Sequence, residues 1–324
     1  MLEKYLKMFA NLHTDKNRNR YPATTCHRAP HKPILLLSVM DLIEQGVITQ
    51  NFIEPSLDLV ETFNTYISIV LPAGWKTSMA HPFPRLQSDG FWHRIVNPEY
   101  DSAHNYNVTT MTRLRKIYAG ARMDDFLFHF MLNPETRTRL RTVLIDTYFA
   151  PELQPALLEQ ASVNIAAYEY SKDLLKRVRQ LPLWDTESEE SDKIKKVRDQ
   201  GFRKAVVKLY DHRCAFCGIK MLTPEGHTVV EAAHIRAWSD SHDDRPTNGL
   251  ALCRRCHWSF DEGLMGVGTI YEVLVSKRVR TEQNYLGHIL TLIDRPILKP
   301  DNKIFWPDKN NLEWHRKKKF GRWI

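Results

Sequence analysis

The sequence has no long hydrophobic run. Its uninterrupted apolar stretches, such as residues 34–37, fall far short of the roughly 20 residues that a membrane-spanning helix needs. The first nine residues carry charges throughout, unlike the apolar core of a secretory signal. We therefore expect a cytoplasmic protein that does not bind membranes.

Cysteine is also scarce, which excludes a disulfide-stapled scaffold. Of five cysteines, four form two C-x-x-C pairs, and Cys26 is left over. Two such pairs can close a tetrahedral Zn²⁺ shell with no open coordination position. The sequence therefore predicts a structural zinc ion held by Cys214, Cys217, Cys253 and Cys256.

The charge is not balanced. The chain has 46 Lys and Arg against 38 Asp and Glu, a formal net charge of +8, and a pI near 9.1. A basic excess favours a polyanionic partner. The last sixteen residues, 309–324, hold six Lys and Arg against one Glu; they are either a solvated, partly disordered tail or a phosphate contact.

A length of 324 residues favours two domains. Residues 185–192 contain five acids, three hydroxyl side chains and no apolar one, which is typical of a linker. We therefore expect four parts: a reader domain over 1–180, an acidic linker over 181–196, a second domain over 197–280 and a basic extension over 281–324.

Hydrophobic periodicity predicts a mainly helical first domain. The helices are expected over residues 31–46, 55–71, 124–132, 134–150 and 162–179. The first of these is apolar on nearly every side and should lie in the middle of its domain. Residues 83–86 and 91–96 flank Asp89-Gly90, a pair typical of a tight hairpin.

The two cysteine pairs are separated by 35 residues, a gap longer than in a plain zinc ribbon. The gap contains His234 and Asn248, and His257 follows the second pair directly. Residues 198–265 thereby resemble the HNH nuclease family, which has a ββα-metal fold. The resemblance implies that His234 is the general base, that Asn248 holds the loop and the His234 ring, and that His257 binds a divalent cation.

The residue chemistry agrees with these roles. A neutral imidazole is available as a base near neutral pH, and a hard cation such as Mg²⁺ or Mn²⁺ keeps several waters. Asp261 lies four residues after His257 on an expected helix, so it is a second candidate ligand. Many HNH proteins have an Asp or His where this chain has Ala233. Either the cation has fewer protein ligands, or Asp261 or Glu231 compensates.

The first domain contains a second resemblance. Residues 27–37 and 81–92 resemble the sulfur-binding domain of type IV, modification-dependent restriction enzymes, which recognise DNA whose backbone carries a phosphorothioate. An apolar wall can prefer weakly hydrated sulfur to oxygen, while charged side chains hold the phosphate. The residues expected at this DNA-binding site are His27, Arg28, Lys32, His81, Pro82 and Phe83. The alternative is that the loop around Pro82 is only a turn.

Together these patterns predict an α+β protein in which a helical reader with a small hairpin precedes a zinc-stapled ββα-metal domain. The expected function is a defence endonuclease that cuts double-stranded DNA near a phosphorothioate, acting as a homodimer. Two alternatives are open: an HNH enzyme that reads methylated or hydroxymethylated cytosine, and a non-catalytic zinc-stapled DNA-binding protein.

Overall fold

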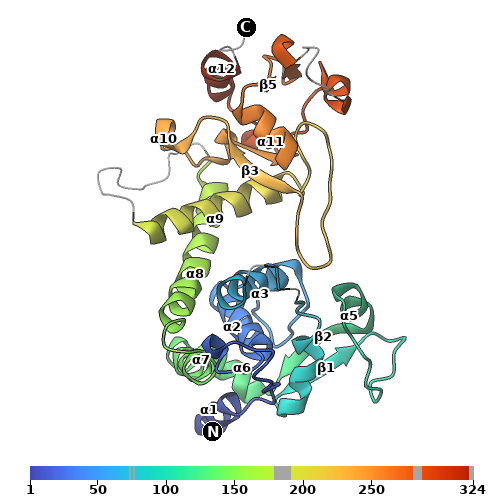
Figure 1. Cartoon of the computed structure of the whole chain (residues 1–324), viewed down its shortest axis with the longest axis vertical. Coiled ribbons are helices and arrows are strands. Elements are labelled where there is room, and N and C mark those ends of the chain that lie inside the picture. The colour runs from blue at the N-terminus through green and yellow to red at the C-terminus, as the bar shows by residue number, and fades with distance from the viewer. Residues whose placement is uncertain (73, 76, 179–190, 280–286, 321–324) are drawn as a thin grey trace. The chain divides into compact units, whose positions relative to one another are not determined.

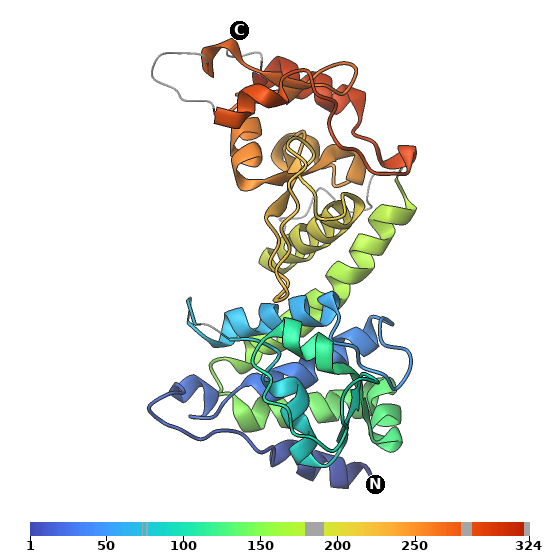
Figure 2. The same cartoon turned by 90° about the vertical axis from the view of Figure 1, so that its right-hand side faces the viewer.

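The computed structural model describes residues 1–72, 74–75, 77–178, 191–279 and 287–320. The chain divides into two compact units. Unit 1 comprises Met1–Ile165 with Pro224–His227, and unit 2 comprises Ala166–Thr223 with Thr228–Ile324. The units can be followed by colour in Figure 1 and, turned by 90°, in Figure 2. Both units combine helices with short two-stranded antiparallel sheets, as the predicted α+β class requires.

Unit 1 is mainly helical around one central helix, α2. Its elements are α1 (Leu2–Ala10), η1 (Ala23–Thr25), α2 (His31–Glu44), α3 (Leu57–Val70), α4 (Pro82–Arg85), η2 (Leu86–Asp89), β1 (Trp92–Val96), α5 (Met111–Ile117), β2 (Tyr118–Met123), α6 (Asp125–Leu132) and α7 (Pro134–Tyr148). Every residue of α2 from Lys32 to Ile43 is buried, because α3, α4, α6 and α7 all pack on it. The predicted central helix is confirmed.

The centre of unit 1 also contains a buried charge. Asp41 of α2 accepts hydrogen bonds from the Tyr66 hydroxyl at 2.7 Å, from Arg141 Nη1 at 2.6 Å and from Asn164 Nδ2 at 2.8 Å. A buried carboxylate is tolerated when it is paired and its oxygens are all hydrogen-bonded. These contacts tie α2 to α3 and α7.

The hairpin predicted around Asp89-Gly90 is wrong. Residues before the turn form the helical segments α4 and η2, because Pro82 suits the first turn of a helix and Phe83 and Leu86 lie three apart on one buried face. Gly90 ends η2 with a φ of +83°, which favours glycine. The strand partner of β1 is instead β2, with Trp92 opposite Met123.

A 23-residue helix, α8 (Gln154–Lys176), crosses from unit 1 into unit 2. The acidic segment 185–192 and the expected linker 181–196 lie largely outside the described residues. The next helix, α9 (Asp192–Leu209), begins inside that range, where the Ser191 hydroxyl accepts a hydrogen bond from the Ile194 amide. No helix among the described residues is both long and apolar enough to cross a membrane.

Unit 2 is built around the antiparallel pair β3–β4. Its further elements are β3 (Val230–His234), α10 (Trp238–Ser241), η3 (Pro246–Asn248), β4 (Gly249–Cys253), α11 (Arg254–Asp261), β5 (Met265–Val267), β6 (Val273–Val275), η4 (Lys277–Val279), η5 (Gly287–Leu292), η6 (Lys303–Phe305) and α12 (Lys309–Lys318). Figure 1 shows β3 between α9 and α11, and both helices contact β3 and β4. Two strands followed by α11 form the predicted ββα unit.

The basic C-terminal segment is ordered over α12. His315 lies against the Phe260 ring, with centroids 3.7 Å apart, and its Nε2 is 3.0 Å from the Phe260 carbonyl oxygen. Arg316 donates to the Val267 carbonyl at 2.8 Å. This part of the basic extension therefore packs on unit 2 and is not a disordered tail.

Candidate functional site

The four paired cysteines converge in unit 2. Their sulfur atoms all lie within 4.8 Å of one another, and Cys217 Sγ is 3.8 Å from Cys253 Sγ. Zinc–sulfur bonds of about 2.3 Å place the sulfurs of a tetrahedral site about 3.8 Å apart. Cys214 and Cys256 are fully buried, so the cluster fits a closed structural zinc ion that fastens the first knuckle to β4 and α11.

His234 is the last residue of β3, and its ring is fixed from two directions. Nε2 lies 2.7 Å from the Asp244 carboxylate, and the ring stacks on Phe202 of α9 with centroids 3.9 Å apart and planes 6° apart. The side chain keeps 20% of its surface exposed. The imidazole is thus held rigidly but can still be reached.

Asn248 holds the loop between β3 and β4. Its Nδ2 donates to the carbonyls of Arg236 at 2.9 Å and Asp243 at 2.8 Å, and its Oδ1 accepts from the Arg236 amide at 3.0 Å. The residue is fully buried. Asn248 therefore shapes the loop as the resemblance implies, whereas the His234 ring is held by Asp244 and Phe202.

His257 of α11 lies between two carboxylates. Its Nδ1 is 3.1 Å from Glu231 of β3, and its Nε2 is 3.4 Å from Asp261. The two ring nitrogens thus face different carboxylates, so a cation bound by His257 would have either Glu231 or Asp261 as a second ligand. Burial raises the pKa of Asp261, an effect opposed mainly by the neighbouring His257.

Strand alternation separates His234 from His257. Glu231, which contacts His257, and His234 are three residues apart on β3 and point to alternate faces. A side chain at Gly249, the strand partner of His234, would touch Phe202 of α9. Among the described residues no hydrogen bond joins the two histidines, and about 10 Å of strand separates the Cα atoms of Glu231 and His234.

Comparison with protein families identifies this region. Residues 214–268 match a family described as HNH endonuclease. Unit 2 carries an HNH endonuclease domain. A solved structure titled "Modification dependent TagI restriction endonuclease" is 25% identical over 36% of this chain and 36% of its own, with a TM-score of 0.26. The chain thus spans about a third of that structure, and no curated protein matches it.

Outside the HNH domain, the structure brings together the two segments of unit 1 that resemble a sulfur-binding domain. Burial, together with the smaller effects of the charges of His81 and Arg20, lowers the pKa of His31 to about 4. The pKa of His81 is lowered by burial, then by Arg85 and Arg20. These four residues lie close enough to form one basic cluster, which we call the basic cluster of unit 1.

Two residues predicted to bind DNA, Lys32 and Phe83, are buried. The Lys32 ammonium is buried and donates to Asp89 at 2.6 Å and to Ser88 at 2.9 Å. Phe83 is fully buried and packs edge-on against Trp92. Lys32 thus pairs with Asp89 at the wall of a polar cavity, and Phe83 is part of the hydrophobic core of unit 1.

Of the other predicted reader residues, His27, Arg28 and His81 are half-buried and Pro82 is buried. Arg28 is half-buried, with its guanidinium 5.6 Å from the centre of the Tyr148 ring. His27 is half-buried at a φ of +54°, and its Nδ1 is 3.0 Å from the Tyr21 carbonyl. His81 is half-buried, and Pro82 is buried beneath it as the first residue of α4.

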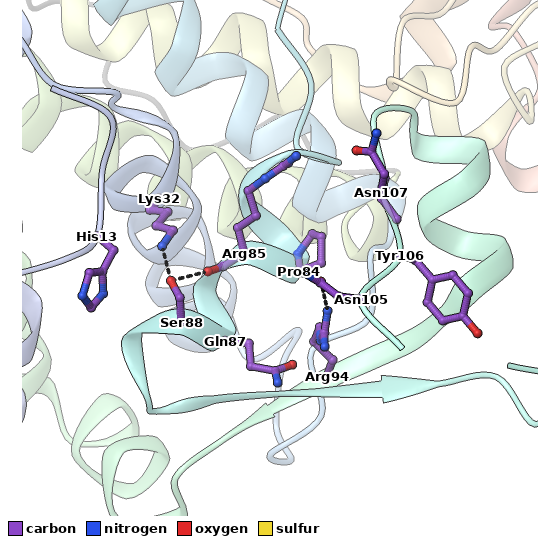
Figure 3. A pocket seen from close by; sticks show the side chains of 11 residues that line it. His13, Lys32, Pro84, Arg85, Gln87, Ser88, Arg94, Asn105, Tyr106 and Asn107 are labelled. Carbon is purple, nitrogen blue, oxygen red and sulfur yellow. Dashed lines mark hydrogen bonds between the residues drawn. The ribbon is translucent and has the colours of Figure 1, made fainter. Parts of the chain in front are cut away.

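A polar cavity of about 670 Å³ lies beside these segments (Figure 3). Arg94 donates to Asn105 at 3.2 Å within it, and Arg85 rises from its wall. Its lining residues are His13, Lys32, Pro84, Arg85, Gln87, Ser88, Arg94, Asn105, Tyr106, Asn107 and Val108. Arg94 and residues 105–108 were not identified from the sequence, because no motif marks them.

The sequence also did not identify Asp244 as the partner of His234. The only available sign was its position in Asp243-Asp244, between His234 and Asn248. Trp258 of α11, on the same helix as His257, is 60% exposed.

Proposed function

We propose that this protein is a DNA endonuclease whose HNH domain hydrolyses phosphodiesters near a phosphorothioate that unit 1 recognises. The main observation that supports nuclease activity is the HNH family match at residues 214–268, which contains His234, Asn248 and His257. The ββα arrangement around them supports it.

In this proposal His234 is the general base. Its ring is fixed and part of it is exposed, and imidazole is the side chain that most often acts as a general base. Asn248 keeps the loop after β3 in place through three hydrogen bonds. The four cysteines hold a structural zinc ion that stiffens this scaffold.

His257 would hold the catalytic Mg²⁺ or Mn²⁺ with either Glu231 or Asp261. One imidazole and one carboxylate suit a hard cation that keeps several waters. When bound, such an ion stabilises charge on the phosphate and on the leaving 3′ oxygen. Glu231 would then compensate for Ala233, where many HNH proteins have a ligand, because both residues face the same side of β3.

Support for sulfur recognition comes from unit 1. In the basic cluster of unit 1, Arg20 and Arg85 carry the positive charge that can attract a phosphate, because the lowered pKa values of His31 and His81 favour neutral imidazoles. Arg28 lies a few residues before His31, and the largely buried Pro84 of α4 lines the polar cavity beside Arg85 as an apolar part of its wall. A basic rim beside an apolar wall is the combination that would favour sulfur over oxygen.

Matched plasmids with and without backbone phosphorothioates test both halves of the proposal. With Mg²⁺ or Mn²⁺, the full-length protein should cut the modified plasmid and spare the unmodified one. Equal cutting of both plasmids would contradict sulfur recognition but would still support nuclease activity. No cutting of either plasmid with either cation would contradict the nuclease.

The cavity favours a second candidate for unit 1. A volume of about 670 Å³ exceeds what a sulfur atom needs, and Gln87, Asn105 and Asn107 offer amides that can read a base edge. An extruded methylated or hydroxymethylated cytosine would use such a site. Competition by methylated DNA, with Asn105→Ala as the variant, separates this candidate from sulfur reading.

Cutting both strands with one site per chain would require two copies. We therefore propose that the active species on DNA is a homodimer. Sedimentation of the protein with a short modified duplex should show two chains per duplex, and a single chain that makes double-strand breaks would contradict it.

A further inference from the structure

Asp244 is buried at the centre of a polar network in unit 2. Its Oδ1 lies 2.7 Å from His234 Nε2, and its Oδ2 accepts the Tyr170 hydroxyl at 2.9 Å. Arg198 Nε is 3.4 Å from the same Oδ2. Asp244 is fully buried and the Arg198 side chain is 3% exposed, so the arginine balances the carboxylate charge away from bulk water.

This network fixes the tautomer of His234. An ionised carboxylate can only accept hydrogen bonds, so the shared proton belongs to Nε2. In the neutral ring, Nδ1 then keeps its lone pair. The stacked Phe202 ring fixes the plane of the imidazole, and the hydrogen bond to Asp244 fixes its rotation within that plane. The direction in which the Nδ1 lone pair points is therefore fixed.

The network uses residues outside the segment that matches the HNH family. Tyr170 lies on α8 and Arg198 on α9, whereas the match begins at residue 214. Gly201 makes this possible: a Cβ there would lie 2.7 Å from Tyr170 Cδ1 and 2.9 Å from the Ala167 carbonyl oxygen. Glycine thus lets α8 approach α9 closely enough for Tyr170 to reach Asp244.

We propose that Asp244 is the positioning residue of His234, and that Tyr170 of the connecting helix α8 holds Asp244 in place. This inference rests on the proposed role of His234 as general base. When the oxygen of a water molecule bonds to phosphorus and the bond from phosphorus to the 3′ oxygen breaks, the water proton passes to Nδ1. Asp244 then stabilises the imidazolium through Nε2–H, and the 3′ oxygen takes a proton from solvent.

The test compares full-length variants on phosphorothioate plasmid. Asp244→Asn keeps the shape but lets an amide N–H face Nε2, which favours the other tautomer; kcat should fall by about 100-fold or more with DNA affinity unchanged. Tyr170→Phe removes one hydrogen bond to a charged group and should lower kcat about 10-fold. Tyr168→Phe, on the same helix, is the matched control and should cut like wild type.

A second readout needs no cleavage. ¹⁵N NMR of imidazole-labelled protein should find the His234 proton on Nε2 in wild type and a shift toward Nδ1 in Asp244→Asn. If wild type cuts DNA but Asp244→Asn cuts within about threefold of it, or if the wild-type proton lies on Nδ1, positioning is refuted. If wild type cuts no DNA, the proposed function fails. Should Asp244→Asn not fold, Tyr170→Phe decides, and wild-type kcat in that variant refutes the inference.

Discussion

Each unit buries a carboxylate between a tyrosine and an arginine, and only the third partner differs in kind. Asp41 of unit 1 is held by Tyr66, Arg141 and the amide of Asn164. Asp244 of unit 2 is held by Tyr170 and Arg198, and by the imidazole of His234. When the third partner is an amide, as at Asp41, this arrangement of buried charges cannot take part in proton transfer. It can support proton transfer when that partner is an imidazole with 20% of its surface exposed.

Removing zinc should produce the largest difference in stability between the two units, because the four cysteines lie in unit 2 alone. Structural zinc contributes an apparent binding free energy of about 10–16 kcal/mol in small domains. We expect a chelator, or Cys256→Ser, to unfold β3–β4 and release Asp244, while α2 and the Asp41 network stay protected. Hydrogen exchange read by mass spectrometry on peptides from both units measures this.

The exposed cysteine provides the control for that experiment. Cys26 lies in unit 1, away from the cluster, so Cys26→Ser should leave zinc content and exchange unchanged. Full protection of β3–β4 in zinc-free protein would contradict a structural role for the four cysteines.

Asp41→Ala should produce the next largest effect, confined to unit 1. It removes the fully buried partner of Arg141, which keeps only the part-exposed Glu44, and should cost about 3–5 kcal/mol of unfolding free energy. Denaturant unfolding followed by exchange on α2 measures the loss. If Asp41→Ala lowered kcat for DNA cutting while unit 1 stayed folded, the distinction between an inert and a functional carboxylate would fail.

Acid should weaken both units alike, because each buries a histidine. Burial lowers the pKa of His31 in unit 1 and of His315 in unit 2 to about 4 in each case. The folded pKa lies below the unfolded value, so this stability is present above about pH 6.5 and is lost as the pH falls toward 4. Between pH 7 and pH 5 each should cost about 2 kcal/mol.

Urea unfolding at the two pH values tests the acid effect. His315→Phe removes the group that takes up the proton, so unit 2 should lose most of its acid sensitivity while unit 1 keeps its own. The same pH slope for unit 2 in the variant and in wild type would show that His315 does not carry the effect.

The smallest effect comes from a matched pair on α7. Arg139 contacts Glu3 at 2.8 Å with both side chains half or more exposed, whereas Arg141, two residues on, is buried against Asp41. Arg139→Ala should cost less than about 1 kcal/mol, and Arg141→Ala several times more. Equal losses in equilibrium unfolding would mean that burial does not set the strength of these pairs.

The sequence predicted unit 2 better than unit 1, and the reason is chemical. Zinc accepts few ligand types at short spacings, so the positions of Cys214 and Cys253 could be interpreted without knowing the fold. The network around Asp244 could not be predicted, because Tyr170 and Arg198 reach it from helices more than forty residues away in sequence. Nothing in a linear pattern records which helix faces meet.

In unit 1, residue types were a poorer guide. Lys32 looks like a phosphate ligand, but Asp89 neutralises it inside the protein. Residues 83–86 were interpreted as a strand because Asp89-Gly90 is typical of a hairpin turn, but Phe83 and Leu86, three apart, lie on one face of a helical turn. Helix α2, in contrast, was predicted because the twelve mostly apolar residues between Pro33 and Gly46 leave few alternatives.

The most direct test of the account is single-turnover cutting of phosphorothioate plasmid by His234→Ala. The protein and Mg²⁺ should be saturating, and binding should be measured in parallel. We predict that the rate falls by at least about 100-fold while the dissociation constant for the plasmid stays within a factor of two. A His234→Ala protein that binds and cuts at the wild-type rate would contradict the assignment of the general base.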